Sequence, residues 1–114
     1  MNQCVMKDMD TIIQEIVKFR DERDWEQFHN SKDLALALSI EASELLELFL
    51  WKDNEDFNLD KLKDELADVF MYALLLANKH DLDIKKIVLE KIKKNADKYP
   101  VDKAKGSATK YNEL

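Results

Sequence analysis

Apolar residues recur at every third or fourth position over most of the chain, which is the period of an amphipathic α-helix. This pattern predicts four helices, over residues 7–22, 32–51, 59–79 and 84–98. The segments between them are short and polar, so consecutive helices are expected to run back alongside one another. The pattern therefore predicts an all-α fold, an antiparallel four-helix bundle.

Local start and stop signals agree with these helix ends. Three positions suit a side chain that caps a first turn: Asn30 or Ser31, Asn58, and Asp83. Tyr99 precedes Pro100, and a residue before proline is pushed out of the helical conformation, so the fourth helix ends there. Beyond this point the chain becomes polar, and we expect a loop or an ordered arm over about residues 100–114.

Length and composition favour one small helical domain. The 114 residues include one glycine and one proline, which leaves few tight turns, and they contain no internal repeat. A chain of this size fits a single core. We therefore expect one domain over residues 1–114.

Charge and cysteine content narrow the classes of partner. Acidic residues outnumber basic ones by 24 to 18, the net charge is −6, and no long basic stretch is present, so nucleic acid binding is disfavoured. Cys4 has no second cysteine to pair with, and the sequence has neither a membrane-spanning apolar run nor a signal-peptide pattern. These features predict a cytoplasmic protein without membrane association.

The second predicted helix carries acids where its pattern should be apolar. Its apolar stripe consists of Leu34, Leu38, Leu45 and Leu48. Glu41 lies midway between Leu34 and Leu48, and Glu44 follows one turn later. A carboxylate on a core-facing stripe is costly unless it is paired or binds a cation. These two acids therefore need a structural or functional reason.

The third predicted helix repeats this arrangement. Its apolar stripe consists of Leu62, Leu66, Val69, Ala73 and Leu76. Glu65 and Asp68 are three residues apart, so they lie on neighbouring turns of one face and border this stripe. If the two helices pack side by side, these acids meet Glu41 and Glu44. Carboxylates that close require a cation, and oxygen ligands select Mg²⁺ or Mn²⁺, which commonly serve substrate phosphates.

Two other interpretations of the acids compete with a magnesium site. Acids at this spacing occur by chance in an acidic sequence and are then simply solvated. A di-iron carboxylate bundle needs a Glu-x-x-His pair on each of two helices, and His80 has no glutamate three residues before it. The di-iron interpretation therefore fails, whereas the solvated one stays open.

Several segments of the sequence resemble the MazG-like all-α nucleotide pyrophosphohydrolases. They are RDWEQFH (residues 23–29), LALSIEASELLELFLW (36–51), ELADV (65–69) and KIKKNADKYPVDKAKGSATKYNEL (91–114). The sequence is most similar to the dCTP pyrophosphatase branch, and the last segment is the most specific. Members of this family hydrolyse nucleoside triphosphates to the monophosphate and pyrophosphate with Mg²⁺. The resemblance therefore implies this reaction on dCTP or on a related or modified deoxynucleotide.

The resemblance also implies a metal site and a helper acid. The family's metal ligands fall on Glu41, Glu44, Glu65 and Asp68. Glu41 and Glu44 are thereby candidate catalytic residues as well. Glu47 matches a recurrent family acid and is expected to help position the attacking water. The implied cofactor is Mg²⁺, with Mn²⁺ as a substitute.

Contacts to the substrate are implied in the same way. The implied residues are Trp25, Trp51 and Tyr72 for the base and sugar, and Lys91 and Asn95 for the phosphates or base. Stacking on an aromatic ring contributes about 1 to 3 kcal/mol per base, although packing in a core or subunit interface is the competing role for a tryptophan. The dCTP branch has a histidine in the first helix where this sequence has Ile16, so preference for cytosine stays open.

Two expectations concern assembly and the class of function. The second helix is apolar at Leu45, Leu46, Leu48, Phe49 and Leu50, which leaves a face for a second chain. The resemblance implies a homodimer or homotetramer, with the nucleoside triphosphate site near a subunit boundary. The alternative to an enzyme is a non-catalytic acidic helical module that binds a protein partner or a divalent metal, and it predicts no nucleotide turnover.

Overall fold

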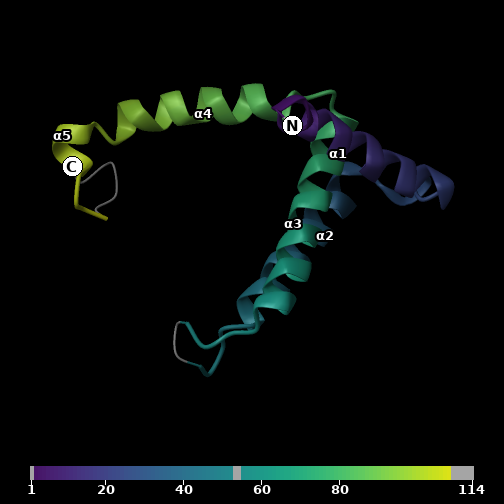
Figure 1. The fold of residues 1–114 in the computed structure, drawn as a ribbon, viewed down its shortest axis with the longest axis horizontal. Helices are drawn as coiled ribbons and strands as arrows, with labels where there is room; N and C mark the ends of the chain where they lie inside the picture. Colours follow the sequence, from purple (N-terminus) through teal and green to yellow (C-terminus); the bar gives the residue numbers. More distant parts are fainter. Residues whose placement is uncertain (1, 53–54, 109–114) are drawn as a thin grey trace. The chain divides into compact units, whose positions relative to one another are not determined.

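The structure is a computed structural model that describes residues 2–52 and 55–108, with side chains from Met9 onward. Its helices are α1 (Asn2–Glu22), α2 (Ser31–Glu47), α3 (Leu59–Lys79), α4 (Ile84–Lys98) and α5 (Val101–Ala104), with a 3₁₀ turn, η1 (Glu26–Phe28) (Figure 1). No strand occurs among the described residues. The prediction of an all-α fold is confirmed. Of the expected C-terminal arm, residues 109–114 lie outside the described residues.

The chain divides into two compact units at residue 82. The first contains α1, α2 and α3, and the second contains α4 and α5. Each unit is described by itself, so three of the four predicted bundle helices are described together. The expectation of a single domain stays a prediction.

In the first unit, α2 and α3 pack side by side and α1 crosses α3 (Figure 1). The Oγ atom of Ser31, the first residue of α2, is 2.7 Å from Nε2 of His80, the residue after α3. At the other end of the pair, the rings of Phe49 and Phe57 have centroids 5.2 Å apart. These contacts at both ends hold α2 and α3 antiparallel and in register.

The core of this unit gathers on one part of α3. Its most buried apolar residues are Ile16, Leu34, Leu74, Leu75 and Ala77. Three of these five lie on α3 because that helix contacts both α1 and α2. A single apolar stripe therefore does not describe α3. Leu66, which the stripe places inward, is 41% exposed.

The end of α2 differs from the prediction. The helix stops at Glu47 rather than at Trp51, and the next three amides, from Leu48 to Leu50, bond to carbonyls three residues back. Trp51 then takes a left-handed backbone conformation with φ of 64°, which a helix cannot continue through. The predicted boundary was wrong because the apolar residues run on past the point where the backbone turns.

The capping residues act as their sequence positions predict. The side chain of Asn30 accepts a hydrogen bond from the Asp33 amide at 2.8 Å. Asn58 does the same for the Lys61 amide at 3.1 Å. These bonds fix where α2 and α3 begin, and hence which of their residues face one another. The Asp83 side chain likewise caps α4.

Two further features bear on the predictions. The first helix begins at Asn2 rather than at residue 7, since no glycine or proline stops it earlier. None of the described helices is long and apolar enough to cross a bilayer.

Candidate active site

Three glutamates on α2 and α3 form an acid cluster. Glu41 and Glu44 lie one turn apart on α2, and Glu65 faces them from α3. Each offers a carboxylate oxygen, and these oxygens all lie within 4.8 Å of one another. The antiparallel pairing of the two helices therefore brings together acids that are 21 or more residues apart in the sequence.

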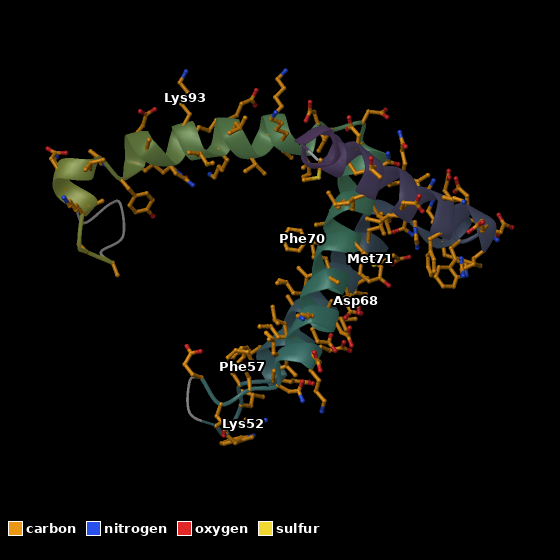
Figure 2. All side chains as sticks on the ribbon, in the orientation of Figure 1. Lys52, Phe57, Asp68, Phe70, Met71 and Lys93 are labelled. Carbon is orange, nitrogen blue, oxygen red and sulfur yellow. The ribbon has the colours of Figure 1, made fainter. Side chains whose placement is uncertain are left out.

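Asp68 lies one turn beyond Glu65 on the same helix. Its charge helps to raise the pKa of Glu41, of Glu65 and of Tyr72, so it stands close to all three. In Figure 2, Asp68 and Met71 project to one side of α3 and Phe70 projects to the other. The structure thus brings all four predicted metal ligands to one side of the α2–α3 pair.

The acids disfavour one another's ionisation. Burial, a hydrogen bond shared with Glu44 and the charges of Glu44, Asp68 and Glu65 raise the pKa of Glu41 to about 7. Burial, again followed by the hydrogen bond and charge of Glu44, raises the pKa of Glu65. Like charges at this distance each penalise the next ionisation. The cluster therefore favours either an added proton or a cation.

Two buried carboxylate oxygens in the cluster indicate whether a metal ion would fit there. One carboxylate oxygen of Glu41 and one of Glu65, Oε2 in each case, are buried and have no hydrogen-bond partner among the described residues. A buried oxygen left without a partner is costly, and a cation would satisfy both. The donors are all carboxylate oxygens, which suits a hard divalent ion such as Mg²⁺ or Mn²⁺. The three glutamates therefore fit a divalent cation, and Asp68 lies close to them.

Beside the acids lies a cavity of about 220 Å³, here called the aromatic cavity. Its lining comprises Ile16, Phe19, Arg20, Trp25, His29, Asp68, Met71, Tyr72 and Leu75. Tyr72 connects it with the cluster, since burial and then the charges of Glu41, Asp68 and Glu44 raise the pKa of its hydroxyl. That hydroxyl therefore keeps its proton and can act as a donor at neutral pH.

The segment after α1 places Trp25 in the cavity wall. Asp24 has a left-handed φ of 53°, and the Trp25 amide then bonds to the Arg20 carbonyl at 3.1 Å. The Trp25 ring meets that of Phe19 edge to face, with centroids 5.7 Å apart. Trp25 is nonetheless 43% exposed, so part of its face is open to a ligand.

Arg20 holds this segment against the core. It is 9% exposed and forms ion pairs of 2.9 Å with Asp21 and with Glu26. Its neighbour in the cavity wall, His29, has a pKa lowered by burial and by the Arg20 charge, against a smaller opposing effect of Glu26. The Nδ1 atom of His29 is buried without a partner among the described residues. Its imidazole is therefore neutral near pH 7 and carries an unused polar atom.

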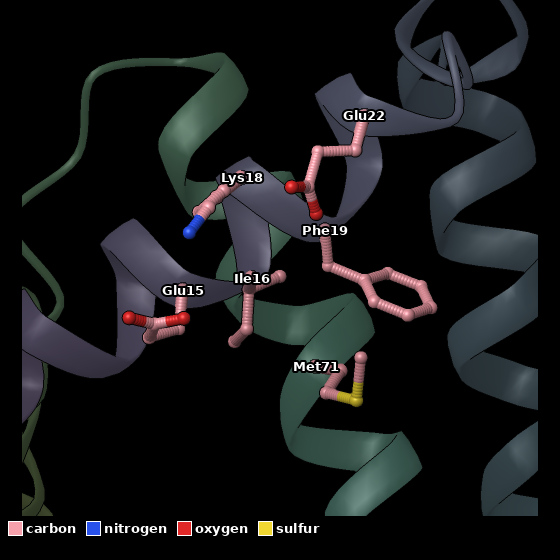
Figure 3. A pocket seen from close by; sticks show the side chains of 6 residues that line it. All are labelled: Glu15, Ile16, Lys18, Phe19, Glu22 and Met71. Atoms are coloured by element: carbon pink, nitrogen blue, oxygen red, sulfur yellow. The ribbon is translucent and has the colours of Figure 1, made fainter.

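Ile16 lines both the aromatic cavity and a second cavity beside it. Figure 3 shows a neighbouring cavity of about 350 Å³ between α1 and α3, and Ile16, Phe19 and Met71 line it as well as the aromatic cavity. These three apolar side chains form the partition between the two spaces. Where the dCTP branch is expected to have a histidine, this chain thus presents a buried apolar surface to the aromatic cavity.

The remaining predicted residues lie elsewhere. Glu47 is exposed and lines a separate cavity beside Glu44 and Glu65. Trp51 is 99% exposed and is absent from the wall of the aromatic cavity. Lys91 and Asn95 lie on α4, in the second unit. The roles of these four in substrate binding or catalysis stay predictions.

Sequence reasoning did not single out Arg20, and it assigned His29 no role. A signal for Arg20 existed, because it follows Ile16 by four residues and so shares its helix face. No comparable signal marked His29, whose Nδ1 atom is buried only after η1 folds back on the core. Both residues therefore depend on packing rather than on a motif.

Comparisons with known proteins agree with this architecture. The model of the MazG-like family matches residues 36–114. The dCTP pyrophosphatase 1 proteins of Rattus norvegicus and Homo sapiens are 40% identical to the chain over 105 residues, and that of Bos taurus is 41% identical. The matched region covers 85% of this chain and 62% of each of those proteins.

A solved structure gives an independent comparison. It is that of a pyrophosphatase from Archaeoglobus fulgidus, which is 34% identical in sequence and superimposes with a TM-score of 0.76. The superposition covers 81% of this chain and 92% of that protein. Sequence and structure agree, and the chain belongs to the MazG-like family.

Proposed function

We propose that this protein is a Mg²⁺-dependent nucleoside triphosphate pyrophosphohydrolase that acts on dCTP or a related or modified deoxynucleotide. The products would be the monophosphate and pyrophosphate. One observation carries the proposal: Glu41 and Glu65 each have a buried carboxylate oxygen with no hydrogen-bond partner among the described residues, and their cluster adjoins, through Asp68 and Tyr72, a cavity that Trp25 also lines. An acid cluster that calls for a cation, placed beside an aromatic cavity, suits a ligand that has both phosphates and a base.

The acids and the cavity have separate tasks in this proposal. Glu41, Glu44 and Glu65, together with the nearby Asp68, would hold Mg²⁺. A bound divalent ion supplies positive charge to the triphosphate and to the departing pyrophosphate. Trp25 offers a partly open ring for stacking, and the protonated Tyr72 hydroxyl can donate a hydrogen bond between base and phosphates. Glu47 would orient the attacking water from the exposed side of the cluster.

The relatives support this choice of reaction. The mammalian proteins are named dCTP pyrophosphatase 1, and the archaeal structure is of a pyrophosphatase. Ile16 bears on the base, because an apolar side chain cannot hydrogen-bond to cytosine. The substrates tested should therefore include related and modified deoxynucleotides as well as dCTP.

A substrate panel with a matched pair of variants tests the proposal. Pyrophosphate release is measured from a set of deoxynucleoside triphosphates with and without Mg²⁺. We expect Mg²⁺-dependent release, and a loss of about a hundredfold or more in Glu41→Gln, because the variant lacks one ligand of the ion that would stabilise the reacting phosphate, and one such electrostatic interaction commonly contributes this much. Asp64→Asn removes an exposed acid on α3 outside the cluster and should keep full activity. Absence of turnover in the wild type would favour a non-catalytic module.

We further propose that the enzyme is a cytoplasmic homodimer or homotetramer. In the first unit, Leu36, Ile40, Leu46 and Phe70 are each between 49% and 60% exposed. Apolar side chains exposed in this number on a small chain favour burial against a second copy. Light scattering at micromolar concentration should give at least twice the mass of one chain. A monomer would contradict the proposed assembly without affecting the proposed reaction.

A further inference from the structure

The cavity that Glu47 lines adjoins the acid cluster on the side of Lys61, whereas the aromatic cavity adjoins it on the side of Tyr72. Its volume is about 590 Å³, and we call it the lysine cavity. It is lined by Glu44, Glu47, Leu48, Lys52, Asn58, Lys61 and Glu65. Glu44 and Glu65 belong to both the cavity and the cluster, so the two are continuous. A ligand held at the cluster therefore has room to extend into this cavity.

The lysine cavity contains two cationic side chains, those of Lys52 and Lys61. Neither Lys52 nor Lys61 forms an ion pair with a carboxylate of the described residues, although three glutamates line the same cavity. Both lysines are exposed. Figure 2 shows Lys52 at the end of the pair where α2 and α3 are joined. Their ammonium groups are therefore available to an anion, and a lysine is a suitable point charge for phosphate.

The order of groups along α3 indicates which anion. Lys61, Glu65, Asp68 and Tyr72 follow one another at i, i+4, i+7 and i+11, so they share one face of the helix. From Tyr72 to Lys61 the rise is about 16 Å along the axis. An elongated ligand with its base in the aromatic cavity and its phosphates at the acids would therefore reach Lys61 with its far end.

We propose that Lys61, assisted by Lys52, binds the terminal phosphates of the triphosphate and so selects triphosphates over monophosphates. This inference rests on the proposed function and adds a binding residue to it. These phosphates are the part of the substrate that leaves as pyrophosphate. The subsite therefore binds the leaving group and should also bind free pyrophosphate. A nucleoside monophosphate does not extend to Lys61, so its binding affinity should not depend on this lysine.

The test compares ligands that reach Lys61 with one that does not. Affinities of the full chain for pyrophosphate and for dCMP, both with Mg²⁺, are measured by calorimetry, and KM for dCTP is measured where the wild type turns it over. In Lys61→Gln we expect pyrophosphate to bind about tenfold more weakly and KM to rise by a similar factor, as for one lost charge-assisted contact. Affinity for dCMP should be unchanged, and Lys61→Arg should restore most of the loss.

Lys63→Gln is the matched control, because Lys63 is exposed on α3 two residues further on and does not line the cavity. Unchanged affinity for pyrophosphate in Lys61→Gln, an equal loss for dCMP, or an equal loss in Lys63→Gln would each overturn the inference. So would a wild type that does not bind pyrophosphate. Because calorimetry needs no turnover, a wild type without hydrolytic activity but with Lys61-dependent pyrophosphate binding would support the subsite while refuting the proposed function.

Discussion

The two halves of α3 serve different purposes. The later half, here called the core half, contains Leu74, Leu75 and Ala77, which are each 5% exposed and pack in the core of the first unit. The earlier half, here called the polar half, carries Glu65, which is half-buried, and Lys61, which is exposed. Apolar burial in one half thus supplies stability, whereas the other half can carry charges that a core would not tolerate. Substitutions in the two halves should therefore have separable effects.

The largest effect on stability is expected in the core half. Leu74→Ala should lower the free energy of unfolding by about 3 kcal/mol, because it removes buried methyl groups and leaves a cavity. Leu59→Ala, at the start of the same helix where the side chain is 57% exposed, should cost less than about 1 kcal/mol. Urea unfolding followed by circular dichroism measures both. Equal losses would mean that the two halves do not differ as described.

In the polar half, stability should depend on the divalent ion. At about one hundred times its Kd, Mg²⁺ should stabilise the wild type by about 2.7 kcal/mol through binding to the folded state. Glu65→Gln removes one ligand and should lose most of this gain, whereas Asp64→Asn should keep it. Thermal melts with and without Mg²⁺ give the comparison. A full Mg²⁺ effect in Glu65→Gln would place the ion elsewhere.

Without metal, the acid cluster that Glu65 shares with Glu41 of α2 should respond to pH. The pKa of Glu41 is about 7 in the folded protein and 4.5 for an ordinary glutamate, so the folded state binds more protons between these values. The contribution of Glu41 is therefore fully favourable below pH 4.5 and is lost as pH rises to about 7. The metal-free wild type should lose melting temperature relative to Glu41→Gln across this interval. Parallel pH profiles for the two proteins would contradict the assignment.

A smaller effect than that of Leu74→Ala is expected at the cap that begins α3. Asn58→Ala removes the bond from the Lys61 amide and should cost about 1 kcal/mol. Asn58→Asp keeps an acceptor and should be nearly neutral. Denaturant unfolding of the two variants separates capping from mere loss of a polar side chain. A large loss in both would show that Asn58 does more than cap the helix.

Much of this fold was predictable from local signals. The caps at Asn30 and Asn58 and the helical period are short-range features, so they are visible in the sequence. The convergence of Glu41 with Glu65 also followed, once two helices joined by a short connection were assumed to pair. The end of α2 did not follow, since the apolar run continues to Trp51 while the backbone turns at Leu48.

The walls of the cavities lay beyond sequence reasoning. The burial of Arg20 and of the Nδ1 atom of His29 depends on how the segment after α1 folds back, which no periodicity encodes. Lys61 could have been noticed, because it precedes Glu65 by four residues on the same face. It was overlooked because an exposed lysine near the start of a helix is ordinary, and only the cavity beside the acids gives it a role.

One measurement tests the central claim, that the acid cluster performs chemistry without holding the fold. Pyrophosphate release and metal-free thermal unfolding at pH 8 are measured on the same preparations of wild type and Glu65→Gln. Because burial and the neighbouring acids raise the pKa of Glu65, removing its charge should leave the melting temperature equal or higher. Activity should fall by about a hundredfold or more. Retained activity, or an unfolded variant, would contradict the account.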